Sequence, residues 1–231
     1  MNHIPVQLED IRNRVVAATV KAGRDPKSVK LIAVSKTFPI GAVTVAYGCD
    51  QILFGENKVQ ELEIKVPVLA NDIEWHLIGH LQSNKVVKAV ALADYIHAVD
   101  TAKLVKRIDR LAGEAGTKPK FLLEINISGE LSKFGVTEDV DSLALAEVAS
   151  QCEHASFVGL MTMAPHGSTP DELHSIFSGL RNLRDTMQTS LNISLPELSM
   201  GMSSDFEIAI EEGATFVRIG TAIFGERDYS V

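Results

Sequence analysis

Lys36 is the residue of this chain whose type and position point most directly to chemistry. It follows the apolar run of residues 31–35 (LIAVS), whose composition predicts a buried strand that ends at the lysine. A lysine amine that apolar walls keep from water loses its proton more easily, and the neutral amine is a nucleophile toward aldehydes. The alternative is a solvated lysine just beyond a strand end, because buried lysines are rare.

Two loops near the C-terminus combine small residues with hydroxyl groups, as anion sites do. Residues 201–205 (GMSSD) and 219–222 (IGTA) each connect an expected strand to an expected helix. Backbone N–H groups at the start of a helix, together with a hydroxyl, bind phosphate groups. The simpler interpretation of either serine is a helix N-cap, but two such loops together favour a phosphate site. The expected contributors are Ser203, Ser204, Gly220 and Thr221.

Arg218 lies inside the last expected strand, between Val217 and Ile219. A guanidinium at such a position needs a partner because its desolvation is costly. It forms either a structural ion pair or a bond to a ring nitrogen or an anion of a ligand. An aldehyde-seeking lysine, a phosphate site and a buried arginine together indicate pyridoxal 5′-phosphate (PLP). The PLP aldehyde would bond Lys36, its phosphate would lie on the two loops, and its ring nitrogen would face Arg218.

A repeated strand–helix pattern places these residues at one end of a barrel. Eight apolar, strand-like runs alternate with helix-like runs, and the short connections force parallel strands with right-handed crossovers. The pattern predicts a (β/α)8 barrel, a TIM barrel, whose active face lies at the C-terminal ends of the strands, with an extra N-terminal helix near residues 6–23. A doubly wound open sheet is the alternative, although no glycine-rich dinucleotide fingerprint follows the first strand. The expected strands cover residues 31–35, 51–55, 74–79, 95–99, 120–127, 156–163, 197–202 and 216–220.

Length and composition are those of an ordinary globular protein. The chain has 231 residues, of which 45% are hydrophobic and 23% charged, and we expect residues 1–231 to form a single domain. A net charge of −8 and a pI near 5.4 argue against general binding to nucleic acid or to anionic membranes. No apolar run has the length of a membrane span, and Cys49 and Cys152 lack metal-site spacing. We therefore expect a cytoplasmic protein.

Six segments, in order along nearly the whole chain, resemble the pyridoxal phosphate homeostasis proteins. They are residues 33–37 (AVSKT), 54–61 (FGENKVQE), 75–85 (WHLIGHLQSNK), 159–165 (GLMTMAP), 198–203 (LSMGMS) and 217–225 (VRIGTAIFG). The resemblance implies a barrel of the alanine racemase N-terminal type and a Schiff base between PLP and Lys36. It also implies that Asn57 lies beside the cofactor and that Arg218 approaches the pyridine nitrogen. The implied phosphate contacts are the Ser203 region, Gly220 and Thr221.

The residue types around the expected site favour a PLP carrier over a fast enzyme. A guanidinium is a donor only, so Arg218 leaves the pyridine nitrogen unprotonated and PLP a weak electron sink. Racemisation needs an acid–base group on each face of the substrate carbon, and Lys36 serves one face. Tyr47 is expected in helix packing and Tyr95 at the far end of the barrel. Tyr229, in the C-terminal tail, is the tyrosine that could reach the mouth.

We therefore predict a monomer that holds PLP, limits the free aldehyde and hands it to apo forms of PLP-dependent enzymes. The resemblance implies this role in PLP (vitamin B6) homeostasis. A slow PLP-dependent amino-acid racemase is the alternative, and a barrel enzyme that binds phosphorylated sugars without PLP is a third hypothesis. Lys133 is either a contact for anionic groups at the mouth or a solvated loop lysine. No metal site is expected, because the histidines lack ligand spacing with carboxylates.

Overall fold

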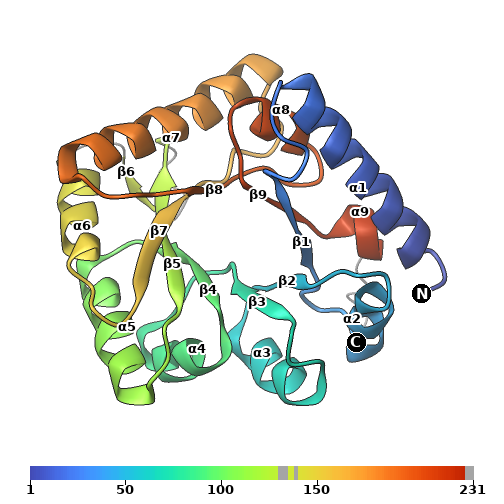
Figure 1. Cartoon of the computed structure of the whole chain (residues 1–231), viewed down its shortest axis with the longest axis horizontal. Helices are drawn as coiled ribbons and strands as arrows, with labels where there is room; N and C mark the ends of the chain where they lie inside the picture. Colours follow the sequence, from blue (N-terminus) through green and yellow to red (C-terminus); the bar gives the residue numbers. More distant parts are fainter. Residues whose placement is uncertain (130–134, 138–139, 227–231) are drawn as a thin grey trace.

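Eight parallel strands close into a barrel, which confirms the predicted (β/α)8 fold (Figure 1). The computed structural model of the chain describes residues 1–129, 135–137 and 140–226. The barrel strands are β1 (Lys30–Val34), β2 (Leu53–Glu56), β3 (Glu74–Leu77), β4 (Tyr95–Val99), β5 (Lys120–Asn126), β7 (Ser156–Met161), β8 (Glu197–Ser199) and β9 (Phe216–Ile219). Their order is β4-β3-β2-β1-β9-β8-β7-β5, and β5 pairs with β4 to close the sheet. The alternative of an open, doubly wound sheet is therefore wrong.

A helix follows each barrel strand and packs on the outside of the barrel (Figure 1). The additional helix α1 (Ile4–Lys21) contacts α2, α8 and α9, so it covers the side where the first and last units meet. None of the described helices is long and apolar enough to cross a membrane. The other helices are α2 (Ile40–Tyr47), α3 (Val59–Lys65), α4 (Val86–Leu92), α5 (Ala102–Ala115), α6 (Val140–Ser150), α7 (Pro170–Leu191), α8 (Phe206–Glu211) and α9 (Thr221–Phe224), with the 3-10 turns η1 (Val66–Val68) and η2 (Ser83–Lys85).

Two apolar layers hold the helices on the barrel and fill its interior. Outward-facing strand residues such as Ala33 and Leu123 pack with the buried faces of the helices in one large cluster. Successive residues of a strand face opposite sides of the sheet. The same alternation turns Arg218, two residues after the inward-facing Phe216, into the barrel interior. The interior cluster consists of Ile32, Val34, Tyr95, Ala98, Leu122, Met161 and Phe216.

The structure differs from the predicted elements at two helix starts that matter for the site. The sequence pattern predicts helices near residues 57–69 and 204–212, whereas α3 begins at Val59 and α8 begins at Phe206. Asn57, Ser203 and Ser204 consequently lie in loops at the C-terminal end of the barrel. The sequence pattern also does not predict β6 (Val136–Thr137), a two-residue strand that pairs with β5 beside the barrel.

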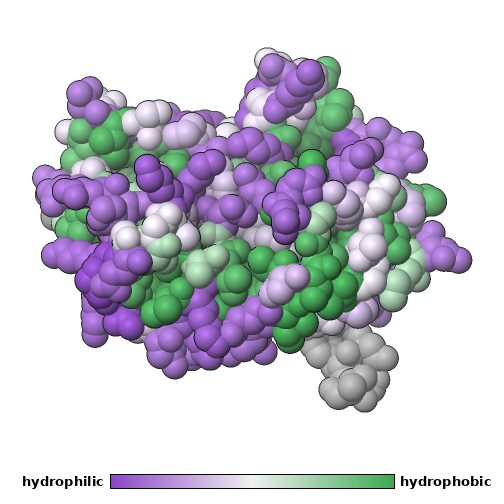
Figure 2. Space-filling view, turned by 60° about the horizontal axis from the view of Figure 1, so that its bottom comes forward, coloured by the Kyte–Doolittle hydropathy of each residue, from purple (hydrophilic) through white to green (hydrophobic). Residues whose placement is uncertain are grey.

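The face at the bottom of Figure 1 carries exposed apolar side chains among hydrophilic ones (Figure 2). Ile64 of α3, Val68 of η1 and Val87 of α4 are each more than half exposed. Single apolar side chains on the surface are normal for folded proteins, because there is not enough polar surface to cover them all. This face therefore gives no indication of a binding site by itself.

Candidate functional site

One cavity at the C-terminal end of the barrel brings together all seven residues that the sequence predicts for the cofactor. Its volume is about 430 Å³. The predicted residues that line it are Lys36, Asn57, Ser203, Ser204, Arg218, Gly220 and Thr221. The rest of its wall consists of Val34, Ile78, Gly79, His80, Glu124, Met163 and Met202. Closure of the parallel barrel thus gathers residues from strand ends that are far apart in the sequence.

A strained turn holds Lys36 at the end of β1. The Phe38 N–H donates to the Ser35 carbonyl at 3.1 Å, and Thr37 has a φ of 68°, as the third residue of a type II turn does. A β-branched residue rarely adopts this left-handed conformation, which costs about 1–3 kcal/mol. The Thr37 N–H donates to Glu61 Oε2 at 2.6 Å, and this bond offsets part of the strain. The backbone on both sides of Lys36 is therefore fixed.

A buried ion pair lies directly behind that turn. Lys65 Nζ, on α3, donates to Glu56 Oε1 at 2.6 Å and to the Ser35 carbonyl at 2.9 Å. Ser35 Oγ donates to the same carboxylate oxygen at 2.6 Å. The side chains of Lys65 and Glu56 are 5% and 0% exposed, and burial raises the pKa of Glu56 to about 7 against the opposing effect of Lys65. Ser35 forms hydrogen bonds with both members of the ion pair and directly precedes Lys36. The ion pair therefore links the turn that carries Lys36 to α3.

Glycine at position 79 allows Asn57 to take its place in the cavity wall. A Cβ at residue 79 would overlap the backbone carbonyl of Asn57. The loop after β3 can therefore lie against the Asn57 backbone only because residue 79 is glycine. Asn57 precedes α3, whose N-cap is Lys58, and it is half-buried. The close approach of the two loops therefore sets Asn57 at the cavity.

The loop after β8 turns tightly before α8 and presents its two serines to the cavity. Gly201 has a φ of 92°, and Asp205 Oδ1 accepts from the Met202 N–H at 2.6 Å. Asp205 is the N-cap of α8. The interpretation of Ser203 or Ser204 as an N-cap is therefore wrong, because Asp205 closes the loop and both serines precede the helix.

The loop after β9 lies beside the loop after β8, because the two strands are neighbours in the barrel. Gly220 is the N-cap of α9 and Thr221 is the first residue of that helix. A Cβ at Gly220 would lie 3.2 Å from the Val34 carbonyl oxygen, so a larger residue would press on β1. Small residues and hydroxyl groups from the two loops thus border one side of the cavity.

Arg218 is buried under the cavity with uncharged hydrogen-bond partners. Its Nη1 donates to Ser199 Oγ at 2.6 Å and its Nη2 to the Thr162 carbonyl at 2.9 Å. Among the described residues, no carboxylate forms an ion pair with it, so the alternative of a structural ion pair is not supported there. Burial lowers the pKa of Arg218 to about 10, while the charges of Asp205 and Glu124 oppose this. The guanidinium therefore stays charged at neutral pH.

Glu124, on β5, is a cavity residue that sequence reasoning missed. It is 3% exposed, and its Oε2 is buried without a hydrogen-bond partner among the described residues. Burial and the negative charge of Asp100 raise the pKa of Glu124 to about 7, against the attraction of Arg218. The sequence does carry a signal for it, since a charged residue in the apolar run 121–125 is the pattern that identified Arg218.

Comparison with known proteins identifies the family of this chain. Residues 6–228 match the family model of the alanine racemase N-terminal domain. A pyridoxal phosphate homeostasis protein from Aquifex aeolicus is 41% identical over 224 residues, which cover 96% of this chain and 98% of that protein. The chain belongs to the pyridoxal phosphate homeostasis protein family. The resemblance of the six sequence segments is therefore confirmed.

Two solved structures relate this homeostasis-family chain to other barrels. The structure of PipY from Synechococcus elongatus, with PLP bound, has a TM-score of 0.82 at 42% identity, and the match covers 93% of this chain and 100% of that chain. An alanine racemase from Clostridium difficile has a TM-score of 0.75 at 12% identity, and the match covers 100% of this chain and 58% of that chain. The second likeness shows a shared fold and nothing more.

The other side chains considered for chemistry in this homeostasis-family chain lie away from the cavity or outside the described residues. Tyr95 begins β4 at the opposite end of the barrel, where its hydroxyl accepts from Lys120 Nζ at 3.0 Å. The Tyr47 hydroxyl donates to an exposed carboxylate at 2.9 Å. Tyr229 and Lys133 lie outside the described residues. Within the described ranges, no group of three or more His, Cys, Asp or Glu residues could hold a metal ion.

Proposed function

We propose that this chain binds PLP as a Schiff base on Lys36 and takes part in intracellular PLP homeostasis. The observation that carries the proposal is the convergence of an amine, a buried guanidinium and two hydroxyl-bearing loops on one cavity. PipY, at 42% identity, has been solved with PLP bound. The Aquifex aeolicus relative is named for PLP homeostasis and not for an enzymatic activity, which supports the same role here.

The residues of the cavity fit the chemical groups of PLP. When bound, PLP supplies an electrophilic aldehyde carbon, which suits the amine of Lys36. Its phosphate suits the backbone N–H and hydroxyl groups of the loops after β8 and β9. A donor-only guanidinium suits an unprotonated pyridine nitrogen, and Val34 and Ile78 offer apolar contacts to the ring. The proposed binding residues are Lys36, Asn57, Ser203, Ser204, Arg218, Gly220 and Thr221.

A carrier without fast catalysis of its own fits this cavity better than a fast enzyme. Arg218 cannot accept a proton bond from the pyridine nitrogen, so the bound ring withdraws electrons weakly. Lys36 supplies an acid–base group on one face, and neither Tyr47 nor Tyr95 is among the residues that line the described cavity. A slow PLP-dependent racemase is the second candidate, because the chain matches the barrel family of alanine racemase.

Holding PLP on a lysine limits the concentration of a reactive aldehyde, and a competing amine can reverse the bond. We therefore propose apo forms of PLP-dependent enzymes as recipients. The monomeric state, the cytoplasmic location and the single domain of residues 1–231 stay predictions.

The test is a visible absorbance spectrum of the protein with PLP, before and after borohydride, followed by peptide mapping of the reduced adduct. The wild type should show a Schiff-base band that reduction fixes on Lys36. Lys36→Ala should lose the band, whereas Lys58→Ala, at an exposed lysine beside the cavity, should keep it. An adduct spread over surface lysines, or a band retained in Lys36→Ala, would overturn the assignment and favour a different phosphate ligand.

A second measurement separates the carrier from the racemase. The PLP-loaded protein is incubated with single enantiomers of amino acids, and free PLP at the same concentration is the control. The carrier predicts inversion no faster than with free PLP, because one face of the substrate carbon lacks an acid–base group. Steady inversion well above that rate would establish the racemase instead.

A further inference from the structure

A row of hydrogen bonds, here called the interior chain, runs through the barrel from Arg218 to Glu74 at the opposite end. Ser199 Oγ, which accepts from Arg218, lies 2.8 Å from His97 Nδ1. His97 Nε2 lies 2.9 Å from His76 Nδ1, and His76 Nε2 lies 3.1 Å from Glu74 Oε1. The members come from β9, β8, β4 and β3, so the bond between His97 and Ser199 crosses the barrel interior.

Only one arrangement of protons satisfies every link of the interior chain. The contact with His76 lowers the pKa of Glu74, so its carboxyl group is ionised. An ionised carboxylate can only accept, and the His76 proton at this contact therefore lies on Nε2. Burial lowers the pKa of His76, and that of His97 still further, so each ring is neutral with one proton. His76 Nδ1 then accepts from His97 Nε2, and His97 Nδ1 accepts from the Ser199 hydroxyl. The lone pairs of the Ser199 oxygen are left for Arg218.

The reverse arrangement fails at the Glu74 end. It would place both imidazole protons on Nδ1, so that His76 Nε2 and the Glu74 carboxylate would face each other as two acceptors. It would also turn the Ser199 hydroxyl hydrogen away from His97. A buried acceptor without a donor is costly, so the carboxylate at the far end determines the direction in which the whole chain donates.

Aromatic packing keeps the two imidazoles in place. His76 and His97 are fully buried, at 0% exposure. Tyr95 stacks on His76 with ring centroids 4.6 Å apart, and Phe216 packs edge-on at 5.2 Å. The rings therefore cannot rotate without moving their neighbours. The charged groups that act on the members of the chain from outside it are Asp94 and Lys30 on His76, and Lys30 and Lys120 on Glu74; within the chain, Arg218 acts on His97.

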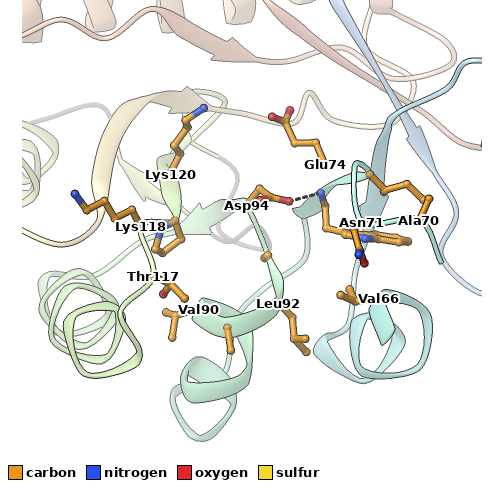
Figure 3. A pocket seen from close by; sticks show the side chains of 15 residues that line it. Val66, Ala70, Asn71, Glu74, Val90, Leu92, Asp94, Thr117, Lys118 and Lys120 are labelled. Carbon is orange, nitrogen blue, oxygen red and sulfur yellow. Dashed lines mark hydrogen bonds between the residues drawn. The ribbon is translucent and has the colours of Figure 1, made fainter. Parts of the chain in front are cut away.

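Glu74 gives the interior chain an end in solvent. Its side chain is 33% exposed, and it lines a second pocket of about 350 Å³ at the N-terminal ends of the strands. Figure 3 shows Glu74 in this pocket together with Asp94 and Lys120. The interior chain therefore connects this pocket with the cavity at the other end of the barrel.

We propose that the interior chain positions Arg218 in the cavity and that Glu74 sets the direction of its hydrogen bonds. With an acceptor at position 74, the Ser199 hydroxyl donates to His97 Nδ1, and the lone pairs of its oxygen accept from the Arg218 guanidinium. Without that acceptor, both rings can exchange tautomers and Ser199 can present its hydrogen to Arg218, which is itself a donor. The consequence for PLP rests on the proposed function, whereas the positioning of Arg218 is a property of the unliganded protein.

Three variants separate the acceptor from the charge. Glu74→Gln keeps a carbonyl oxygen for His76, whereas Glu74→Met has a similar length and no strong acceptor. Asp94→Asn removes a negative charge that acts on His76 from the same pocket, but the Asp94 side chain forms no hydrogen bond with a member of the interior chain, so this variant is the control for charge. In the unliganded protein, nitrogen-15 NMR reports which ring nitrogens carry protons, and the Arg218 guanidinium signals report how freely that group rotates.

The wild type, Glu74→Gln and Asp94→Asn should show both rings protonated on Nε2 and a slowly rotating Arg218 guanidinium. Glu74→Met should mix the tautomers, speed the rotation and weaken PLP binding about fivefold, the effect of losing one neutral hydrogen bond. Wild-type rings protonated on Nδ1, or mixed tautomers with unchanged rotation of Arg218, would overturn the proposal. Failure of the wild type to bind PLP would instead refute the proposed function. The measurements on the unliganded protein would still decide whether the interior chain positions Arg218.

A fourth variant covers the case in which Glu74→Met does not fold. Ser199→Ala cuts the interior chain beside Arg218 and leaves the contact between His76 and Glu74 in place. It should free the guanidinium while His76 keeps its proton on Nε2. An Arg218 that rotates as slowly in Ser199→Ala as in the wild type would contradict the positioning role.

Discussion

Replacing Glu124 by glutamine should change how the stability of the protein depends on pH. Burial, together with the charge of Asp100, raises the pKa of Glu124 from an ordinary value of 4.5 to about 7. Between these two values the folded protein holds a proton that the unfolded chain has already released. The free energy of unfolding therefore falls as the pH rises from about 4.5 to about 7.

The size of this effect follows from the two pKa values. At about 1.4 kcal/mol per pKa unit, the difference between 7 and 4.5 corresponds to about 3 kcal/mol. The residue is 3% exposed, so solvent reduces this value little. Glu124→Gln has nearly the same shape and cannot ionise. Its free energy of unfolding, relative to the wild type, should rise by about 3 kcal/mol between about pH 4 and about pH 8.

Urea unfolding at several pH values, followed by the fluorescence of the buried Trp75, measures the effect. Glu56, whose pKa is also raised by burial, is present in both proteins and cancels in the difference. Glu9→Gln, at an exposed position, is the control and should run parallel to the wild type. If the free energy of unfolding of Glu124→Gln also depends on pH as that of the wild type does, burial does not hold a proton on Glu124, and Arg218 keeps this carboxylate ionised over the whole pH range.

Other consequences concern the residues behind Lys36 and Asn57. Lys65→Met should cost about 3–5 kcal/mol in urea unfolding, because it leaves the Glu56 carboxylate buried without its cation, and adding Glu56→Leu should recover most of the loss. Lys65→Met should also slow borohydride trapping of PLP on Lys36, and trapping at the wild-type rate would contradict a role of the pair in holding the turn. Gly79→Ala should destabilise the folded protein by about 1–3 kcal/mol and weaken PLP binding, because the added Cβ overlaps the Asn57 backbone. A midpoint of thermal unfolding and an affinity for PLP equal to those of the wild type would disprove this.

The barrel and the centre of its cavity were predictable for a simple physical reason. Its strands are short apolar runs, and the closure of parallel strands brings their C-terminal ends together. Lys36 and Arg218 stood out because each is a charged residue at or within such a run, and the same criterion applies to Glu124. Helix starts were less certain: Ser204 is a good N-cap type, yet Asp205 takes that position because its carboxylate closes the preceding loop.

Contacts across the barrel were not predictable from the local pattern. Lys65 has the sequence context of a surface lysine, but its place on α3 turns the amine over the strand end and onto Glu56. The bond between His97 and Ser199 joins residues 102 positions apart, on strands that are not neighbours. It depends on the stagger of the strands around the barrel, which no single strand encodes. His97 has the contacts of a satisfied core histidine, with one hydrogen bond at each ring nitrogen.

The charges around Arg218 explain how such an interior chain can serve a ligand site. The hydrogen-bond partners of Arg218, the Ser199 hydroxyl and the Thr162 carbonyl, are neutral, and the histidines beyond Ser199 are neutral as well. The positive charge is therefore balanced mainly by Asp205 and by Glu124, of which Glu124 lines the cavity. When Glu124 holds its proton, the cavity attracts an anion more strongly than when Glu124 is ionised. The interior chain thus orients the Arg218 guanidinium without neutralising it. The protonation state of Glu124, on β5, determines how strongly the remaining positive charge attracts a ligand.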